Sequence, residues 1–295
     1  MLTILLGVLE EGFVYAIMAL GVYITYKILD FPDLSADGTF PLGGAVTVVL
    51  IGAGISPVLT LFISFFAGAV AGMIAGIIHV KFKVRDLLSG IIMMTALYSV
   101  NLRIAGRANV PIFTKDTIFE NPLLEKLIPQ GFQPFLVTAI LLIIVIMMKL
   151  LLDLYLSTKS GYLLRAVGDN ETLVTSLAKD KGTVKIIGLS IANAFVALAG
   201  SIYSQKNGFF EISTGTGTMV IGLASVIIGI NLFKKASFIK TTTAVIIGAV
   251  IYKLCVSIAI SLGMAASDLK FITAALFLII LVLSNDRRRR VKASA

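Results

Sequence analysis

Two polar stretches, each broken by glycine, hold most of the side chains that could bind a small molecule. They lie at 31–43 and 210–222, and each leads into an apolar run. Their polar side chains are Asp33, Ser35, Asp37, Thr39, Glu211, Ser213, Thr214, Thr216 and Thr218. Backbone N–H groups at Gly215 and Gly217, at a predicted helix N-terminus, favour hydrogen bonds to an anionic or carbonyl group. The alternative is that the carboxylates of Asp33 and Asp37 are solvated helix caps.

Catalytic and metal-binding patterns are absent from the sequence. It contains one histidine, His79, and one cysteine, Cys255, which argues against a histidine metal site, a Ser-His-Asp triad and an internal disulfide. It also lacks a G-x-x-x-x-G-K-[ST] loop, H-E-x-x-H and G-x-S-x-G. We therefore expect a chain that is not an enzyme, binds no metal and cannot hydrolyse ATP through a P-loop of its own.

The elements that must position these side chains are membrane helices. Of the 295 residues, 58% are hydrophobic and 14% charged, and the mean hydropathy is +1.00. Soluble domains carry about 25% charged residues. Glu10 and Glu11 interrupt the first apolar run, so we do not expect a cleavable signal. The net charge of +9 is assigned to cytoplasmic loops and anionic lipid headgroups rather than to nucleic acid binding.

The apolar runs predict an all-α polytopic membrane protein with about nine transmembrane helices, within a range of eight to ten. The predicted spans are 9–29, 38–55, 58–80, 87–105, 135–155, 184–204, 217–233, 241–261 and 269–284. The second and seventh are short and rich in glycine, which is typical of broken helices beside a wet cavity. Two polar residues fall inside spans. Lys253 either pairs with a carboxylate such as Asp268 or extends towards the interface, and Asn101 either bonds a neighbouring helix or faces the solute.

The positions of Lys and Arg predict the orientation. Alternation of nine spans puts most of the 25 basic residues on one side, among them Lys81, Lys83, Arg85 and Arg165. That side is predicted to be cytoplasmic, with the N-terminus outside and the C-terminus in the cytoplasm.

The order of the segments predicts one transmembrane domain built from two inverted repeats, 1–105 and 184–285. The polar stretch at 31–43 is echoed at 210–222, and Asp86-Leu87 is echoed by Asp268-Leu269. Because the fifth span lies between the copies, they would have opposite topology, which in transporters places the path at the repeat interface. The remaining segments are an extracytoplasmic loop at 106–133, a cytoplasmic segment at 157–183 and a basic tail at 286–295.

The cytoplasmic segment at 157–183 contains a predicted helix. Asp169 or Asn170 can cap a helix that runs to about Ala178, with Glu171 in its first turn and Gly182 at its stop. Such a helix is either a connector or a docking element for a soluble partner.

Three stretches carry a family resemblance. The runs at 161–170, 222–229 and 33–38 resemble ABC-importer permeases of the branched-chain amino-acid and ribose group, most closely the subgroup for tryptophan, tyrosine and related solutes. The resemblance implies a homodimer of permeases, two cytoplasmic ATPase subunits that bind ATP and Mg²⁺, and an extracytoplasmic solute-binding protein. It implies that this chain has no cofactor and lies in a prokaryotic plasma (inner) membrane. The residues it assigns to ATPase coupling are Arg165, Gly168, Asp169, Asn170, Glu171 and Leu173.

The resemblance also implies the activity: a translocation path for a small solute, with an amino acid expected and an aromatic one the first guess. The polar residues of the two stretches, with Asn101, would line that path. An ion-coupled secondary transporter is the alternative, since it also explains an inverted repeat and buried carboxylates. An intramembrane enzyme has almost no support, because no nucleophile, base and metal set can be assembled.

Overall fold

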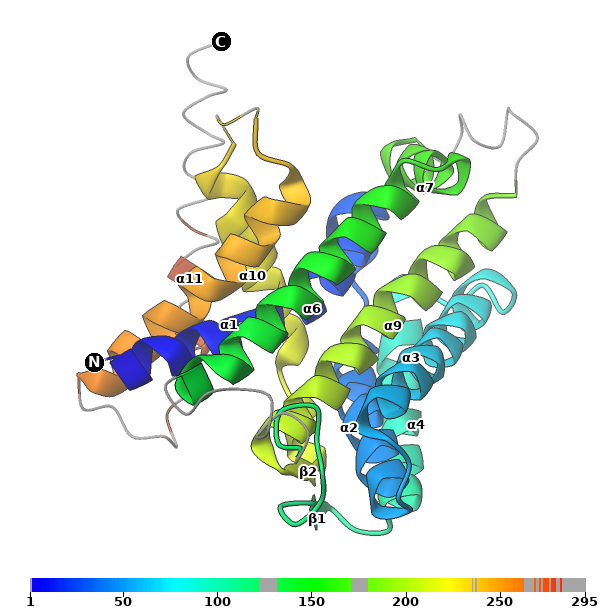
Figure 1. Ribbon diagram of the computed structural model, residues 1–295. Helices are drawn as coiled ribbons and strands as arrows, with labels where there is room; N and C mark the ends of the chain where they lie inside the picture. Colours follow the sequence, from blue (N-terminus) through cyan, green and yellow to red (C-terminus); the bar gives the residue numbers. More distant parts are fainter. Residues whose placement is uncertain are drawn as a thin grey trace.

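The protein is almost entirely helical in a computed structural model that describes residues 2–121, 132–170, 180–234 and 238–262, together with 236, 268, 271, 273–275, 277–279 and 282. The helices are α1 (Leu2–Tyr23), α2 (Ala36–Gly52), α3 (Pro57–Val80), α4 (Asp86–Ala105), α6 (Gln133–Leu156), α7 (Lys159–Asp169), α9 (Lys181–Asn207), α10 (Thr218–Leu232) and α11 (Thr241–Ser261). A π-helical turn, η1 (Ile24–Ile28), extends α1, and a 3₁₀ turn, η3 (Ile212–Gly215), precedes α10. The strands are β1 (Asn109–Pro111) and β2 (Phe209–Glu211), and Figure 1 shows the arrangement.

The predicted all-α polytopic class is confirmed. Seven helical segments of the described chain are long and apolar enough to cross a membrane, and α2 is a shorter apolar helix. Each of the first eight predicted spans falls on one of these helices. Most of the ninth, 269–284, lies outside the described residues, as does the predicted tail at 286–295. The exact helix count and the inverted repeat stay predictions.

The expected breaks occur where α1 meets α2 and where β2 meets α10. At the first break, the π-helical turn ends with Leu29 N–H donating to the Ile24 carbonyl at 2.9 Å, and the chain stays non-helical until α2 begins at Ala36. At the second, η3 and Gly217, which has a φ of +86°, separate β2 from α10. Glycine tolerates this left-handed backbone without a Cβ clash.

Helix α9 forms the centre of the bundle and is its most buried membrane-spanning helix. Glycines allow other helices to approach its backbone closely. A Cβ at Gly72 of α3 would overlap the Leu189 carbonyl oxygen, and one at Gly43 of α2 would overlap that of Ala197. Hydroxyl groups reinforce the packing, since Thr47 of α2 hydrogen-bonds Ser201 of α9. Small residues and hydroxyls are the usual determinants of helix association in lipid, where the hydrophobic effect between helices is weak.

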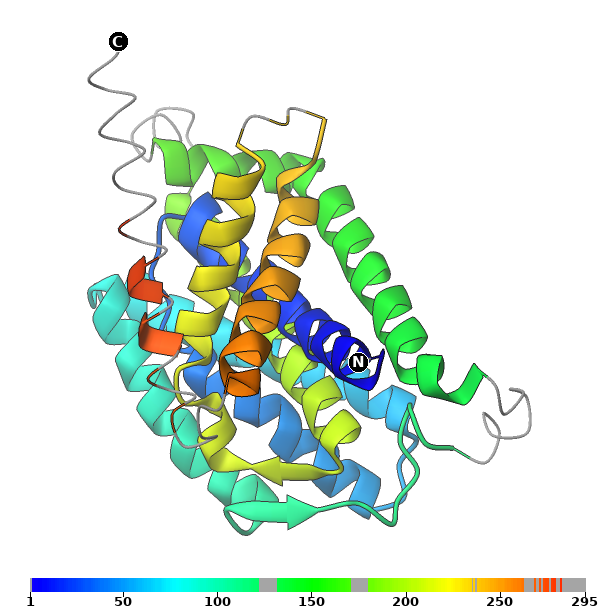
Figure 2. The ribbon, with the colours of Figure 1, turned by 90° about the vertical axis from the view of Figure 1, so that its left-hand side faces the viewer.

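The bundle has two chemically different ends, which lie at the top and bottom of Figure 1. At one end β1 pairs antiparallel with β2, Asn109 opposite Glu211, so the long loop after α4 is tied to the chain before α10. We call this the sheet end. At the other lie α7 and the α10–α11 connection, and we call it the α7 end. In Figure 2, α10 and α11 stand side by side with α1 crossing beside them.

Basic residues predicted to share one side gather at the α7 end. Lys81 follows α3 directly, Arg85 precedes α4, and Lys240 precedes α11. Arg165 lies on α7 itself, near Lys240. The predicted orientation makes the α7 end cytoplasmic.

The structure describes only part of the segment at 157–183. The described part contains a helix that was not predicted, α7, which Thr158 caps at its N-terminus and which ends before Asn170. The predicted helix at 170–178 falls almost wholly on residues that the structure does not describe, Glu171 and Leu173 included. Gly182 lies in the first turn of α9 and is not a C-terminal stop, because Asp180 caps that helix through the N–H groups of Gly182 and Thr183.

Candidate functional site

The two polar stretches meet inside the bundle, through Asp37 and the N-terminus of α10. One Asp37 carboxylate oxygen accepts a hydrogen bond from the Gly217 N–H at 2.9 Å. The other accepts from the Met219 N–H at 2.7 Å and from the Thr218 hydroxyl at 3.0 Å. A carboxylate at this place satisfies N–H groups that have no partner within the helix and favours the positive end of its dipole. We call this contact the α2–α10 junction.

The junction corrects two expectations. The Gly217 N–H donates to Asp37, so it does not provide an anion site for a solute. The capping alternative is therefore right for Asp37, although its carboxylate caps a helix 180 residues further along the chain rather than its own. The stretches were predicted to precede their spans on opposite sides of the membrane. In the structure each enters the bundle from a different end, and they meet within it at Asp37 and Gly217.

Asp33 and Ser35 form a second polar contact with α9, and all its members are buried. The Asp33 carboxylate accepts from Asn193 Nδ2 at 2.8 Å and from the Ser35 N–H at 2.9 Å. The Ser35 hydroxyl donates to Asn193 Oδ1 at 3.1 Å. Asp33 is 2% exposed, so solvation of its carboxylate is not the explanation for this residue. The contact anchors the break between α1 and α2 to the central helix.

Thr39 and Asn101 are buried and take part in helix packing. The Thr39 hydroxyl donates to the Ser35 carbonyl one turn earlier. Asn101 of α4 donates to the Gly38 carbonyl of α2 at 2.9 Å, which is the interhelical alternative considered for it. Neither residue lines the principal cavity described below.

Glu211, Ser213 and Thr214 lie at the sheet end. The Ser213 hydroxyl donates to the Glu211 carboxylate, and the Thr214 hydroxyl donates to the Glu211 carbonyl. Ser213 is exposed and Glu211 is half-buried. These side chains bond one another close to the surface and do not reach the principal cavity.

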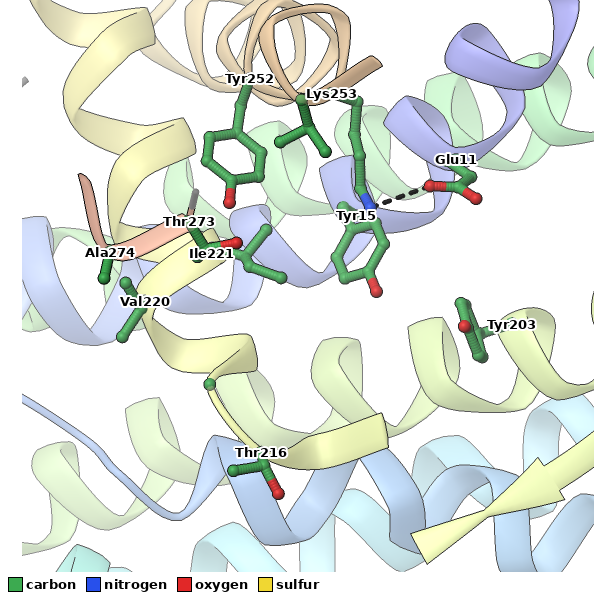
Figure 3. Close-up of a pocket in the computed structure, with 12 residues that line it drawn as sticks. Glu11, Tyr15, Tyr203, Thr216, Val220, Ile221, Tyr252, Lys253, Thr273 and Ala274 are labelled. Atoms are coloured by element: carbon green, nitrogen blue, oxygen red, sulfur yellow. Dashed lines mark hydrogen bonds and ion pairs between the residues drawn. The ribbon is translucent and has the colours of Figure 1, made fainter. Parts of the chain in front are cut away.

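A cavity of about 350 Å³ opens beside the junction, and we call it the principal cavity because Gly217 of the junction forms part of its wall. A neighbouring cavity of about 380 Å³ shares Glu11 and Lys253 with it. The walls of the principal cavity come from α1, α9, α10, α11 and the helical residues 273–274, as Figure 3 shows. The lining residues are Glu11, Tyr15, Tyr203, Thr216, Gly217, Val220, Ile221, Tyr252, Lys253, Val256, Thr273 and Ala274. Of the predicted path residues only Thr216 lines it, and the volume lies at the lower end of the range for small-molecule sites.

One ion pair and three tyrosines give the cavity its chemistry. Lys253 of α11 donates to the Glu11 carboxylate of α1 at 2.9 Å. The Lys253 ammonium also lies over the Tyr15 ring, 4.0 Å from its centroid, which is a cation–π geometry. The Tyr15 ring meets that of Tyr203 edge to face at 6.2 Å. Figure 3 shows Lys253 directed towards Glu11 and the Tyr252 hydroxyl pointing towards Thr273.

The sequence-based prediction missed most of this cavity. Lys253 pairs with a carboxylate, which is one of the two alternatives considered for it, and the partner is Glu11 rather than the example, Asp268. A signal existed, because Glu11 and Lys253 are opposite charges inside apolar spans, and such residues are functional candidates by default. Nothing in the sequence joins two residues 242 positions apart. The tyrosines carried no signal.

The arrangement supports binding rather than covalent chemistry. Within the described part of the chain no group of three or more His, Cys, Asp and Glu side chains could hold a metal ion. The cavity lining contains neither histidine nor cysteine, and its one carboxylate is held in an ion pair. Its apolar walls with a few convergent polar groups are typical of a site that holds a small molecule.

The described coupling residues lie on or next to α7. Arg165 and Asp169 are exposed with Tyr162, while Leu164 and Val167 are buried. Gly168 packs against η1, where a Cβ would overlap the Ile28 carbonyl oxygen. The helix therefore presents one face outward and presses the other on the turn that ends α1.

Comparison with known proteins agrees with this architecture. Residues 4–283 match the family described as the permease component of the branched-chain amino acid transport system. The tyrosine transport system permease protein of Clostridioides difficile (strain R20291) is 45% identical over 281 residues, which cover 95% of this chain and 91% of that protein.

Two relatives are more distant. The ribose import permease protein of Escherichia coli (strain K12) is 25% identical and covers 76% of this chain and 68% of its own length. The probable branched-chain amino acid transport permease protein of Methanocaldococcus jannaschii is 24% identical. The match covers 72% of this chain and 70% of that protein. No solved structure matches the chain significantly. The chain belongs to the permease-component family of the branched-chain amino acid transport system, and it is a multi-pass membrane permease of an ABC-type transport system.

Proposed function

We propose that this chain is the membrane-spanning subunit of an ATP-driven importer and forms the path for an amino acid. Two copies would form the path, two cytoplasmic ATPase subunits would bind and hydrolyse ATP with Mg²⁺, and an extracytoplasmic protein would deliver the solute. The similarity to a tyrosine transport permease supports an amino acid as the solute. The chain itself would bind no cofactor.

The contact between α7 and η1 is the observation that carries the proposal. Gly168 lies against the Ile28 backbone with no room for a side chain between them. The opposite face of α7, with Tyr162, Arg165 and Asp169, is exposed at the end that the basic residues assign to the cytoplasm. A partner bound to the exposed face would therefore act directly on the turn that ends α1.

A continuous series of contacts leads from that turn to the cavity. Seven residues after Ile28, Ser35 bonds Asn193 of α9, and two residues later Asp37 caps α10. Gly217, held by Asp37, lines the cavity. A displacement of α7 would thus reach the α2–α10 junction through only a few residues of chain. Chains of packed side chains and hydrogen bonds of this kind can carry energetic coupling between distant sites.

Reconstitution tests the proposal. The permease, the proposed ATPase partner and the binding protein are placed in proteoliposomes, and uptake of L-tyrosine is measured with and without ATP. We expect uptake only with ATP and all components. Asp169→Lys should abolish uptake and solute-stimulated ATP hydrolysis, because it reverses the charge on the exposed face of α7. Lys159→Ala, at the start of the same helix, is the matched control.

The rival secondary transporter gives a different result in the same vesicles. It predicts uptake by this chain alone, which collapses when the Na⁺ or H⁺ gradient is removed. Uptake without the ATPase would therefore reject the importer. If Asp169→Lys retains solute-stimulated ATP hydrolysis, the docking role of α7 is rejected, but the importer is not.

A further inference from the structure

We propose that the cavity between α1, α9, α10 and α11 is a binding site for a zwitterionic α-amino acid with an aromatic side chain, in which Glu11 and Lys253 hold the charged groups and Tyr15, Tyr203 and Tyr252 surround the ring. This inference rests on the proposed function, since it names the solute class of that path.

The ion pair retains hydrogen-bonding capacity for a ligand. An ammonium has three N–H donors, and a carboxylate has about four acceptor sites. The contact between Lys253 and Glu11 uses one of each at 2.9 Å. Lys253 can therefore donate to a ligand carboxylate while Glu11 accepts from a ligand ammonium. The α-carbon of an amino acid holds these two groups side by side, as the cavity holds their partners.

Charge balance selects against other solutes. The described lining contains one cation, Lys253, and one anion, Glu11, so a bound zwitterion leaves the balance of these lining charges unchanged. A solute with only a carboxylate or only an amine would add a net charge beside this pair, of which the Lys253 side chain is 12% exposed and the Glu11 side chain 48%. Unpaired charges away from water are strongly disfavoured. An uncharged sugar would use neither member of the pair.

The remaining walls fit a ring. Tyr15 and Tyr203 already make an edge-to-face contact at 6.2 Å, and the other lining side chains include Val220, Ile221 and Val256. Aromatic rings prefer offset-stacked or edge-to-face neighbours of this kind. The tyrosines come from α1, α9 and α11, so an aromatic side chain would contact three helices at once.

The cavity also touches the junction. Thr216 and Gly217 form one wall, and the N–H of Gly217 is held by Asp37. A ligand in the cavity would therefore contact the segment through which α7 is connected to α10.

Direct binding tests the assignment without the binding protein. The permease with its ATPase partner is placed in lipid nanodiscs, and binding of radiolabelled L-tyrosine is measured. L-phenylalanine should compete. Tyramine, which lacks the carboxylate, and 3-(4-hydroxyphenyl)propionate, which lacks the amine, should compete about tenfold more weakly or worse, because each loses one charged hydrogen bond. L-isoleucine should compete weakly and D-ribose not at all.

A second ion pair on the same helix provides the control. Glu10 pairs with Lys206 of α9 at 3.3 Å, and neither lines the cavity. Lys253→Met and Glu11→Gln should each weaken L-tyrosine binding about tenfold or more, whereas Glu10→Gln should bind as the unmodified protein does. Tyr203→Leu should reduce the preference for L-tyrosine over L-isoleucine without loss of charge recognition, which covers the case in which a charge variant fails to fold.

Several results would overturn the inference. One is that L-tyrosine does not bind at millimolar concentration. Another is that tyramine competes as well as L-phenylalanine does. A third is that the substitution in the Glu10–Lys206 pair weakens binding as much as those in the Glu11–Lys253 pair. Preference for L-isoleucine would reject the aromatic class. Failure of this site is distinguishable from failure of the importer, because ATP-driven uptake by the complete complex is measured separately. If the complex takes up L-tyrosine normally and Lys253→Met does not change that uptake, only the site is rejected.

Discussion

Asp37 caps the helix that begins after Gly217, although the two residues are 180 positions apart. Its two carboxylate oxygens accept three hydrogen bonds, two of them from backbone N–H groups in the first turn of α10. A helix cap normally comes from the residue just before the helix, which here is Gly217 and has no side chain. The chain has therefore placed the capping group on α2, so that α10 is complete only when α2 is docked against it.

The first prediction concerns that cap. Asp37→Ala should lower the free energy of unfolding by about 1–3 kcal/mol, because it removes charged hydrogen bonds to N–H groups that have no other partner. Asp37→Asn should lower the free energy of unfolding by less than Asp37→Ala does, since the amide oxygen still accepts a hydrogen bond but carries no charge. Thermal unfolding in detergent measures both. Asp116→Asn, at an exposed position of the long loop, is the control. Equal midpoints of thermal unfolding for Asp37→Ala and Asp116→Asn would contradict a stabilising cap.

The second prediction concerns the contact of α2 with α9. Gly43→Ala should prevent correct folding, because a Cβ there overlaps the Ala197 backbone, which cannot move as a flexible side chain does. Overpacking of this kind costs about 1–3 kcal/mol or more. Gly52→Ala at the end of the same helix has no atom within 4 Å of its new Cβ and is the matched control. The two variants are compared by their yield in the membrane and by their size-exclusion elution profiles. A normal elution profile for Gly43→Ala would show that α2 and α9 are not in close contact there.

The third prediction separates structure from coupling on α7. Gly168→Ala should reduce the yield of folded protein, because the Ile28 backbone occupies the place of its Cβ. Asp169→Lys should leave the yield unchanged and remove solute-stimulated ATP hydrolysis, because Asp169 is exposed. Yield and ATP hydrolysis are measured on the same preparations. If Gly168→Ala folds normally and only uncouples, the glycine serves the partner and not the packing.

The fourth prediction concerns the start of α9 and is pH-dependent. Hydrogen bonds from the Thr183 hydroxyl and from the N–H groups of Gly182 and Thr183 hold the pKa of Asp180 below its usual range. A lowered pKa in the folded state means that the contribution is complete above the unfolded pKa of about 3.9 and is lost as the pH falls through the folded value.

Amide hydrogen exchange in the first turn of α9 measures this effect. Asp180→Ala should exchange faster than the unmodified protein at neutral pH, and the difference should shrink once the pH falls below about 4. A difference that stays constant across this pH range would contradict a charged cap.

The fifth prediction concerns the sheet end. Glu211→Ala with Ser213→Ala should reduce uptake by the reconstituted importer without reducing assembly, because the two side chains bond each other near the surface before the chain enters the bundle. Uptake and co-purification with the ATPase are compared. Normal uptake by this double variant would show that Glu211 and Ser213 stabilise a local turn and are not required for transport.

The sequence by itself determined the class of the protein and the places where its helices break. Apolar runs of about 20 residues leave few alternatives to a polytopic membrane protein, and the resemblance of the runs at 161–170, 222–229 and 33–38 implied a permease. The glycine-broken polar stretches at 31–43 and 210–222 marked the two breaks, because backbone released from a helix must find partners within the protein. These inferences depend on composition and short-range spacing, which a sequence displays directly.

Only the tertiary structure decided which residues meet. The pairing of Glu11 with Lys253, the capping of α10 by Asp37 and the anchoring of Asp33 by Asn193 all join distant segments. The three tyrosines are ordinary apolar-span residues in the sequence and become one wall only when α1, α9 and α11 converge. The physical reason is that these contacts depend on how helices cross. Crossing is set by close backbone approaches, such as that of Gly43 of α2 to Ala197 of α9, and the sequence does not identify the partner of each approach.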